Sequence, residues 1–390
     1  MAKNIIFCAD GTWNNPDDEV LTPAERAKAD PPSNVFKLFT HLAGRMVART
    51  KVEDITGQIL EREKRLADSQ GHTLQIAKYI NGVGNGNNKI QELIGGGFGA
   101  GLIKRIVRGY TFISRNYQTG DSIYIVGFSR GAYTARALAG LIASQGLLSN
   151  KFPRGDEASY KLGAQAWYQY RKVGAEKRNV FATLAEAMQD LPNFISSNRV
   201  KEEDYVRNVP VRIVAVWDTV GSLGVPNYNA KDNTISDAFR FADEVLSQKV
   251  TKGIHAIALD EQRLLFTPTL WLKASNVKQV VFPGAHSDVG GGYKEAGLSD
   301  IALKWTIDEM MTEDVLFADS LGNIKPDPLG PAHKPWASLV KVTGGLGVRI
   351  FKPDSGIEAH ASVTIRKLAD AVVNNVGETA AKYWPKNWLN

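Results

Sequence analysis

The most informative stretch of the sequence is Asp121-Ser122-Ile123-Tyr124-Ile125-Val126-Gly127-Phe128-Ser129-Arg130-Gly131. Its first half is rich in β-branched and aromatic residues and predicts a strand. Its second half leads into residues 132–143, a run of mostly small apolar residues that predicts a helix. A strand joined to a helix by G-x-S-x-G is typical of the tight turn that presents a nucleophilic serine.

The two glycines of this turn have a steric role. The chain turns so sharply at the serine that the residues two before and two after it must carry almost no side chain. Ser129 would stand at the helix N-terminus, where the dipole favours developing negative charge. The backbone N–H of Arg130 would be one donor to an oxyanion. We therefore predict Ser129 as a nucleophile; the alternative is an ordinary strand-to-helix turn with packing glycines.

Two more polar residues follow predicted strands. Asp218 comes directly after the apolar residues 211–217, and His286 comes shortly after the apolar residues 277–282. The carboxyl ends of parallel strands share one edge of a sheet, so both should lie near Ser129. Asp218 would orient His286, the general base, and the chain order Ser, Asp, His suits this role. The alternative for Asp218 is a residue that initiates a turn.

Further candidates lie in two loops. The loop after residues 4–9 offers the backbone N–H groups of Gly11 or Thr12 as a second oxyanion donor, with Asp10 in support or as a turn cap. Asp288, two residues from His286, should bond the backbone of its own loop; the alternative is a triad acid in a folded-back loop. The remaining histidines fall in predicted helices, polar loops or the tail: His41, His72, His255, His333 and His360.

Predicted strands and helices alternate along the chain. This order predicts an α/β fold with a mostly parallel central sheet and helices on both faces. We expect one domain over residues 1–390, with a helical insertion or cap at residues 150–208 and a C-terminal segment without a clear pattern at residues 315–390. Residues 53–69 are strongly charged and predict a helix or a mobile insertion. Residues 235–255 show helical spacing.

Composition narrows the class of protein. The chain has 390 residues, a net charge of +6 and one cysteine, Cys8, which we expect to be a buried small hydrophobe. The sequence shows no signal peptide and no membrane span, so we expect a cytoplasmic protein in the producing cell, or one secreted without a signal peptide. There is no long Lys/Arg cluster for nucleic acid, no complete nucleotide motif and no zinc spacing. We therefore expect no nucleic-acid partner, cofactor or metal.

Several motifs together make the sequence recognisable. It resembles the catalytic domain of the type VI secretion lipase effectors, in a family of α/β hydrolases first grouped as a domain of unknown function. The matching stretches are Asp10-Gly11-Thr12, Gly82-Val83-Gly84, residues 120–136, Trp217-Asp218-Thr219-Val220-Gly221, Ala258-Leu259-Asp260-Glu261 and residues 284–293.

The resemblance implies hydrolysis of phospholipids or other carboxylic esters, with Ser129, Asp218 and His286 as the triad. It also implies delivery into a rival bacterium for some members, and therefore a secretion-system or immunity protein as partner. Separately, the basic charge of the chain would allow peripheral contact with an anionic membrane. A lipid substrate would need an apolar entrance, for which Phe98 and the insertion with Trp167 and Tyr168 are candidates. Two alternatives stay open: a hydrolase of small soluble esters, and a non-catalytic effector or interaction module that keeps the hydrolase fold.

Overall fold

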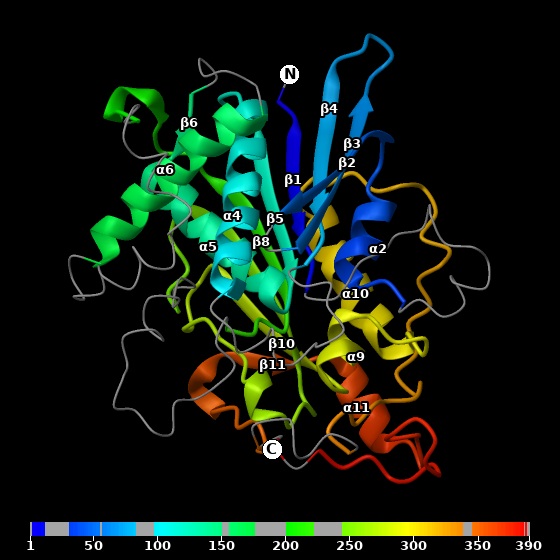
Figure 1. The fold of residues 1–390 in the computed structure, drawn as a ribbon. Helices are drawn as coiled ribbons and strands as arrows, with labels where there is room; N and C mark the ends of the chain where they lie inside the picture. The colour runs from blue at the N-terminus through cyan, green and yellow to red at the C-terminus, as the bar shows by residue number, and fades with distance from the viewer. Residues whose placement is uncertain are drawn as a thin grey trace.

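The computed structural model describes residues 2–11, 31–54, 57–82, 97–149, 156–175, 200–221, 244–337, 345–385 and 387. The strands of the main sheet are β1 (Asn4–Ala9), β2 (Arg45–Asp54), β3 (Gly57–Ala67), β4 (Thr73–Ile80), β5 (Ser122–Phe128), β8 (Val211–Trp217), β9 (Val250–Ala258), β10 (Val277–Phe282) and β11 (Ile357–Ala359). Their order across the nine-stranded sheet is β11-β10-β9-β8-β5-β1-β4-β3-β2 (Figure 1). Only the pairs β4–β3 and β3–β2 are antiparallel, so the predicted mostly parallel sheet is confirmed.

Helices cover both faces of this sheet. They are α2 (Asn34–His41), α4 (Gly97–Asn116), α5 (Arg130–Gln145), α6 (Asp156–Ala175), α9 (His286–Gly290), α10 (Gly297–Met311) and α11 (Ala361–Leu368). Helices α4, α5 and α6 lie on one face, and α2 and α10 lie on the other (Figure 1). Among the described helices, none has both the length and the apolar character that a bilayer crossing requires.

Strand β1 shows why an unbroken apolar run suits this architecture. Side chains alternate between the two faces of a strand. Ile5 and Phe7 therefore pack into the core under α4 and α5, whereas Ile6 and Cys8 pack into the core under α2 and α10. Both faces of β1 are dry because helices cover both, as expected for a central parallel strand.

The strand register brings the candidate site together. Phe128 at the end of β5 pairs with Trp217 at the end of β8, and Ala258 at the end of β9 pairs with Phe282 at the end of β10. Strand β1 ends in register with β5. The residues that follow these strands therefore share one edge of the sheet, the lower edge in Figure 1, where α9 and the C-terminal segment also lie.

The prediction for residues 53–69 is wrong. Residues 53–54 belong to β2 and residues 57–67 to β3, which form an antiparallel hairpin at the edge of the sheet. The charges that suggested a helix have partners across the sheet: Lys78 of β4 lies 2.6 Å from Glu61 and 3.3 Å from Glu63. Opposite charges on neighbouring strands stabilise a strand pair, so a charged sequence can form an edge hairpin.

The helical prediction for residues 235–255 is also wrong where the structure describes it. Residues 235–243 lie outside the described part, and residues 250–255 form the first two thirds of β9. A short buried strand cannot be distinguished from a buried helix by periodicity alone. His255, expected in a helix or a polar loop, is therefore a fully buried residue of a central strand.

Two other predicted regions take partly different forms. In residues 150–208 the structure describes α6 and the two-residue strand β7 (Tyr205–Val206), which pairs with β6 (Leu147–Leu148). Trp167 of α6 is fully buried in the core with α4, so it cannot line a substrate entrance. The side chain of Phe98 lies outside the described part. In residues 315–390, β11 extends the sheet beside β10.

Candidate active site

The turn at Ser129 is the first component of the site. Ser129 joins β5 to α5 with φ 56° and ψ −120°, in the left-handed half of backbone space that non-glycine residues rarely adopt. A Cβ atom on Gly127 would lie 2.3 Å from the carbonyl oxygen of Gly131, and one on Gly131 would lie 2.1 Å from that of Ala9. Both approaches involve backbone atoms that cannot rotate away. Glycine at both positions therefore allows the sharp turn that places Ser129 at the sheet edge, where its side chain is buried.

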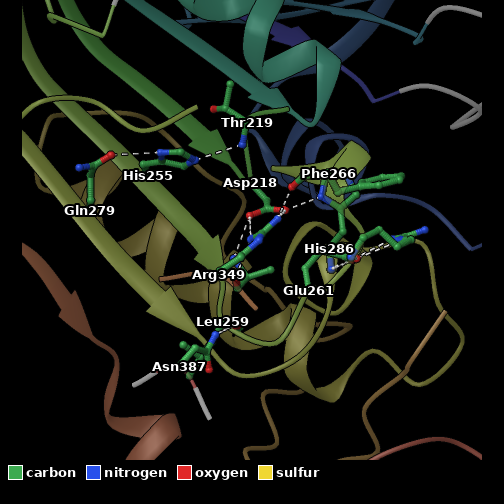
Figure 2. Close-up of polar contacts among 12 residues, drawn as sticks. Asp218, Thr219, His255, Leu259, Glu261, Phe266, Gln279, His286, Arg349 and Asn387 are labelled. Atoms are coloured by element: carbon green, nitrogen blue, oxygen red, sulfur yellow. Dashed lines mark hydrogen bonds and ion pairs between the residues drawn. The ribbon is translucent and has the colours of Figure 1, made fainter. Parts of the chain in front are cut away.

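Asp218 and His286 form a direct pair. Nδ1 of His286 donates to Oδ2 of Asp218 at 2.5 Å, and the backbone N–H of Ala258 donates to Oδ1 at 3.0 Å (Figure 2). Asp218 is fully buried and also has a positive φ of 36°. Because the carboxylate is the acceptor, the proton of the neutral imidazole lies on Nδ1. Nε2 is then left with its lone pair, as a general base requires.

The serine turn meets the imidazole through an aromatic contact. The ring of Phe128, the residue before Ser129, lies 4.6 Å from the ring of His286 between centroids, and that of Phe266 lies 4.9 Å from it. Among the described residues, no hydrogen bond joins the Ser129 hydroxyl to His286. In enzymes without substrate such a bond is often long and tightens in the complex.

Arg349, which no motif in the sequence predicts, binds the same carboxylate. Nη1 donates to Oδ1 of Asp218 at 2.6 Å and Nη2 donates to Oδ2 at 3.0 Å (Figure 2). Burial alone would raise the pKa of Asp218, but the Arg349 guanidinium and the His286 hydrogen bond lower it far below its usual value. The signal that could have revealed Arg349 is a lone cation inside the apolar run Val348-Arg349-Ile350-Phe351.

A second carboxylate holds the backbone of His286. Oε2 of Glu261 accepts the N–H of His286 at 3.1 Å, and the Glu261 carboxylate is also bound by the Arg263 guanidinium through two bonds of 2.8 Å. Burial lowers the pKa of the His286 imidazole below its usual 6.5, although the nearby carboxylates oppose this shift. The imidazole is therefore neutral at neutral pH.

The first loop is organised by Asp10. Its Oδ1 accepts from the Ser33 hydroxyl at 2.6 Å and from the N–H of Gly11 at 2.7 Å, and its Oδ2 accepts from the Tyr79 hydroxyl at 2.6 Å. The Gly11 N–H proposed for an oxyanion thus donates to Asp10 in this structure. Thr12 lies outside the described residues. Arg130 is the first residue of α5, whose first-turn amides point out of the helix N-terminus.

Asp288 bonds the backbone of its own loop and one further histidine. Its Oδ2 accepts the N–H groups of Ala285 and His333, each at 2.9 Å, and its Oδ1 lies 2.7 Å from Nδ1 of His333. The imidazole of His286 bonds Asp218, as above, and not Asp288. His333, expected in an unpatterned tail, is therefore tied to the loop that carries His286.

No metal cluster defines the site in the part of the chain that the structure describes. The described residues contain no group of three or more His, Cys, Asp or Glu side chains that could hold a metal ion. A cavity of about 400 Å³ is lined by Asp260, Gly284, His333 and residues of the C-terminal segment. Ser129, Asp218 and His286 are not among its described lining residues. The convergence of side chains at the sheet edge therefore defines the candidate site.

A mostly parallel sheet with helices on both faces, a strained serine turn and an Asp–His pair at its carboxyl edge define an α/β-hydrolase fold. The chain belongs to the family described as T6SS, Phospholipase effector Tle1-like, catalytic domain, whose model matches residues 3–309. Membership in this family supports a hydrolase role of the lipase and esterase kind.

Similar proteins are longer than this chain or differ strongly in sequence. An uncharacterized yeast protein, YEL023C of Saccharomyces cerevisiae, is 27% identical over 288 residues, which are 68% of this chain and 33% of the relative. A crystal structure of an uncharacterized Pseudomonas aeruginosa protein is 18% identical with a TM-score of 0.44 and covers 84% of this chain and 49% of its own.

A structure of the Tle1 effector bound to the VgrG spike of the type VI secretion system is 18% identical with a TM-score of 0.36, covering 76% of this chain and 52% of its own. The chain thus spans about a third of the yeast relative and about half of these two structures. Because both TM-scores are below 0.5, the fold assignment rests on the strand order and on the family.

Proposed function

We propose that the chain is a serine hydrolase that cleaves carboxylic esters, with phospholipids as the substrate class. Ser129 is the nucleophile, His286 the general base and Asp218 the acid that orients His286. The 2.5 Å hydrogen bond from His286 Nδ1 to the buried Asp218 carboxylate carries this proposal, because it fixes the tautomer that a base needs. The family description, which names a phospholipase effector, supports the choice of substrate class.

The proposed reaction has two acyl-transfer steps. Nε2 of His286 takes the proton of the Ser129 hydroxyl as its oxygen attacks the ester carbonyl. The resulting oxyanion is bound by the N–H of Arg130, and the N–H of Thr12 is the remaining candidate for the second donor because that of Gly11 donates to Asp10. The imidazolium then gives its proton to the leaving alcohol. Water, deprotonated by the same imidazole, cleaves the acyl-enzyme and restores Ser129.

The test is removal of the nucleophile. Ser129→Ala is expected to lower kcat/KM on a p-nitrophenyl ester by at least about 10³-fold, because the acyl-enzyme can no longer form. Labelling by a fluorophosphonate probe should disappear with it. Ser144→Ala, which changes an exposed serine of the same helix α5, is the matched control and should keep both signals.

Thermal melting should show that both variants fold as the parent does. If the parent protein neither turns over the ester nor labels, or if Ser129→Ala keeps its turnover, the proposal fails. The alternative of a non-catalytic module that retains the fold would then take its place. Comparing products from phospholipid vesicles with those from soluble esters distinguishes a phospholipase from a small-ester hydrolase.

A secretion-system or immunity protein is the partner class that we propose, because the family is one of type VI secretion effectors. In the solved structure of the Tle1 effector, that protein is bound to the VgrG spike. Pull-down of this chain with the spike and immunity proteins encoded by its own genome would test the partner class directly.

A further inference from the structure

We propose that Arg349 is a positioning residue of the reaction, which fixes the Asp218 carboxylate in the orientation that receives the Nδ1–H of His286. This inference rests on the proposed function and adds to that function a role for the C-terminal segment. The matched family region ends at residue 309, so Arg349 lies outside the part of the chain that the family describes.

The contacts of the guanidinium carry the inference. Arg349 binds both oxygens of Asp218 through its two Nη atoms, the two-pronged geometry that a planar guanidinium makes with a carboxylate. Nη1 also donates to the carbonyl oxygen of Ala258 at 2.5 Å, and Nη2 to that of Phe266 at 2.6 Å. Arg349 thus links the end of β9, the Phe266 turn and the acid of the pair.

The bonds to Asp218 are distributed evenly. Oδ1 accepts from Ala258 and Arg349, and Oδ2 accepts from His286 and Arg349. Without Arg349 the bond to Ala258 would be the only described anchor besides His286 itself. A fully buried carboxylate without its cation is also strongly disfavoured as an ion, because burial removes its hydration. Arg349 therefore supplies both orientation and charge.

The segment that carries Arg349 is held in register with the same site. The N–H of Leu264 donates to Gly345 at 3.1 Å and the N–H of Gly347 donates to Gln262 at 2.8 Å, so residues 345–347 run antiparallel to residues 262–264. Phe351 is buried against Ile257 and Val281 of the sheet. These anchors on both sides leave Arg349 little freedom to move away from Asp218.

Removing the positive charge should have a defined effect on pH dependence. In acid the Asp218–His286 pair takes up one proton, and this proton binds more tightly when no cation faces the pair, whichever group carries it. Other groups also face the pair: the charged Glu261 and Arg263 after β9, and His255 in β9, which stays neutral because burial lowers its pKa to about 3. All of them remain unchanged when Arg349 alone is replaced.

The experiment compares Arg349→Met, Arg349→Lys and the control Lys352→Met in the full chain. Arg349→Met should lower kcat on a soluble ester about 10²-fold with little change in KM, because the reacting groups lose their alignment. It should also move the acid limb of the pH profile up by about one pH unit or more. Arg349→Lys keeps the charge but not the two-pronged contact. It should lose kcat and keep the acid limb of the parent.

Lys352→Met removes one positive charge from an exposed side chain of the same segment and should change neither value. NMR titration of the ¹³C-labelled histidine rings gives the pKa of His286 in each variant that melts as a folded protein, without any need for turnover. The expected result is a higher pKa in Arg349→Met than in the parent. An unchanged His286 titration, or an unchanged kcat in both Arg349 variants, overturns the inference. Lack of ester turnover by the parent would instead count against the proposed function, and the titration would still judge Arg349.

Discussion

The imidazole of His286 has an environment that separates its two nitrogens. Nδ1 is engaged by the Asp218 carboxylate, and the aromatic rings of Phe128 and Phe266 lie close to the ring. Burial in these surroundings lowers the pKa of His286, because the charged form loses hydration. A base of this kind stays neutral, and so competent, into mildly acidic solution.

This shift predicts the pH profile of the parent protein. Activity needs neutral His286, so kcat/KM should be retained below pH 6.5, the usual pKa of the side chain, and should fall only as the pH passes through the lowered value. The measurement is kcat/KM on a soluble ester from acidic to neutral pH, with Ser129→Ala as the blank. An acid limb centred above pH 6.5 would contradict the assignment of a buried His286 as the base.

The sequence predicts some residues of the site much better than others. Ser129, Asp218 and His286 each follow an apolar strand. Because parallel strands run in the same direction, their carboxyl ends meet at one edge of the sheet. Arg349 follows no strand and no periodic pattern. The lone cation in an apolar run marks Arg349 as unusual, but its position depends on tertiary contacts of residues 345–347 with residues 262–264, which that local signal does not encode.

At the level of elements, the approach of α5 to β1 sets the position of Ser129. Gly131 in the first turn of α5 lies against the carbonyl groups of Ala9 and Asp10. The helix can come this close only because residue 131 has no side chain. The ends of β1 and β5 and the first turn of α5 are therefore in close steric contact, and this contact depends on the two glycines of G-x-S-x-G, Gly127 and Gly131.

Gly131→Ala tests this contact. The added Cβ would lie 2.1 Å from the Ala9 oxygen and 2.4 Å from the Asp10 oxygen, so the backbone must shift. We expect a loss of about 1–3 kcal/mol in the free energy of unfolding, as for other overpacked sites, together with a loss of ester turnover. Denaturant unfolding measures the first effect.

The matched control for this variant is Gly221→Ala. Within the described residues, its Cβ would meet Thr269 Oγ1 alone, at 3.7 Å, an ordinary contact. The stability of Gly221→Ala should stay within about 0.5 kcal/mol of the parent. Equal stability of the two alanine variants would show that the close approach of α5 to β1 is not real.

The hairpin of β2 and β3 shows where the prediction of elements fails. Its charged residues have the composition of a surface helix, and propensity alone cannot reveal that Glu61 and Glu63 face Lys78. Two arginines of α4 also bind these carboxylates. Arg108 lies 3.1 Å from Glu61, and Arg115 is in close contact with Glu63. The strand structure of residues 57–67 depends on ion pairs with β4 and α4, and these partners lie outside the stretch of sequence from which a local prediction is made.

At the scale of the whole molecule, the C-terminal segment completes what the family region begins. Residues 3–309 supply Ser129, Asp218 and His286, whereas the segment beyond them supplies Arg349, the edge strand β11 and the histidine that bonds Asp288. In Figure 1 the later part of this segment, residues 345–385, coloured orange to red, lies along the carboxyl edge of the sheet. It is therefore placed to influence both the chemistry and the surface around the site.

The same segment presents apolar side chains to solvent. Around Arg349, the outward residues Leu346, Val348 and Ile350 are 40%, 44% and 78% exposed, whereas Arg349 and Phe351 point inward and are buried. This alternation is that of an extended chain with one face on the protein and the other face free. This apolar strip beside the site and the net charge of +6 of the whole chain both favour an anionic lipid interface.

If the substrate is a phospholipid in a bilayer, these side chains should enter the interface, where each fully buried one contributes about 1.5–3 kcal/mol. Replacing Leu346, Val348 and Ile350 together by serine should lower the rate on anionic phospholipid vesicles at least about tenfold, since about 1.4 kcal/mol corresponds to a factor of ten. The rate on a soluble ester should stay the same. Leu368→Ser, at a leucine of α11 that is 75% exposed, nearly as much as Ile350, is the control. A parallel loss on the soluble ester would mean that the triple variant has displaced Arg349, and an unchanged rate on vesicles would mean that this strip does not meet the lipid.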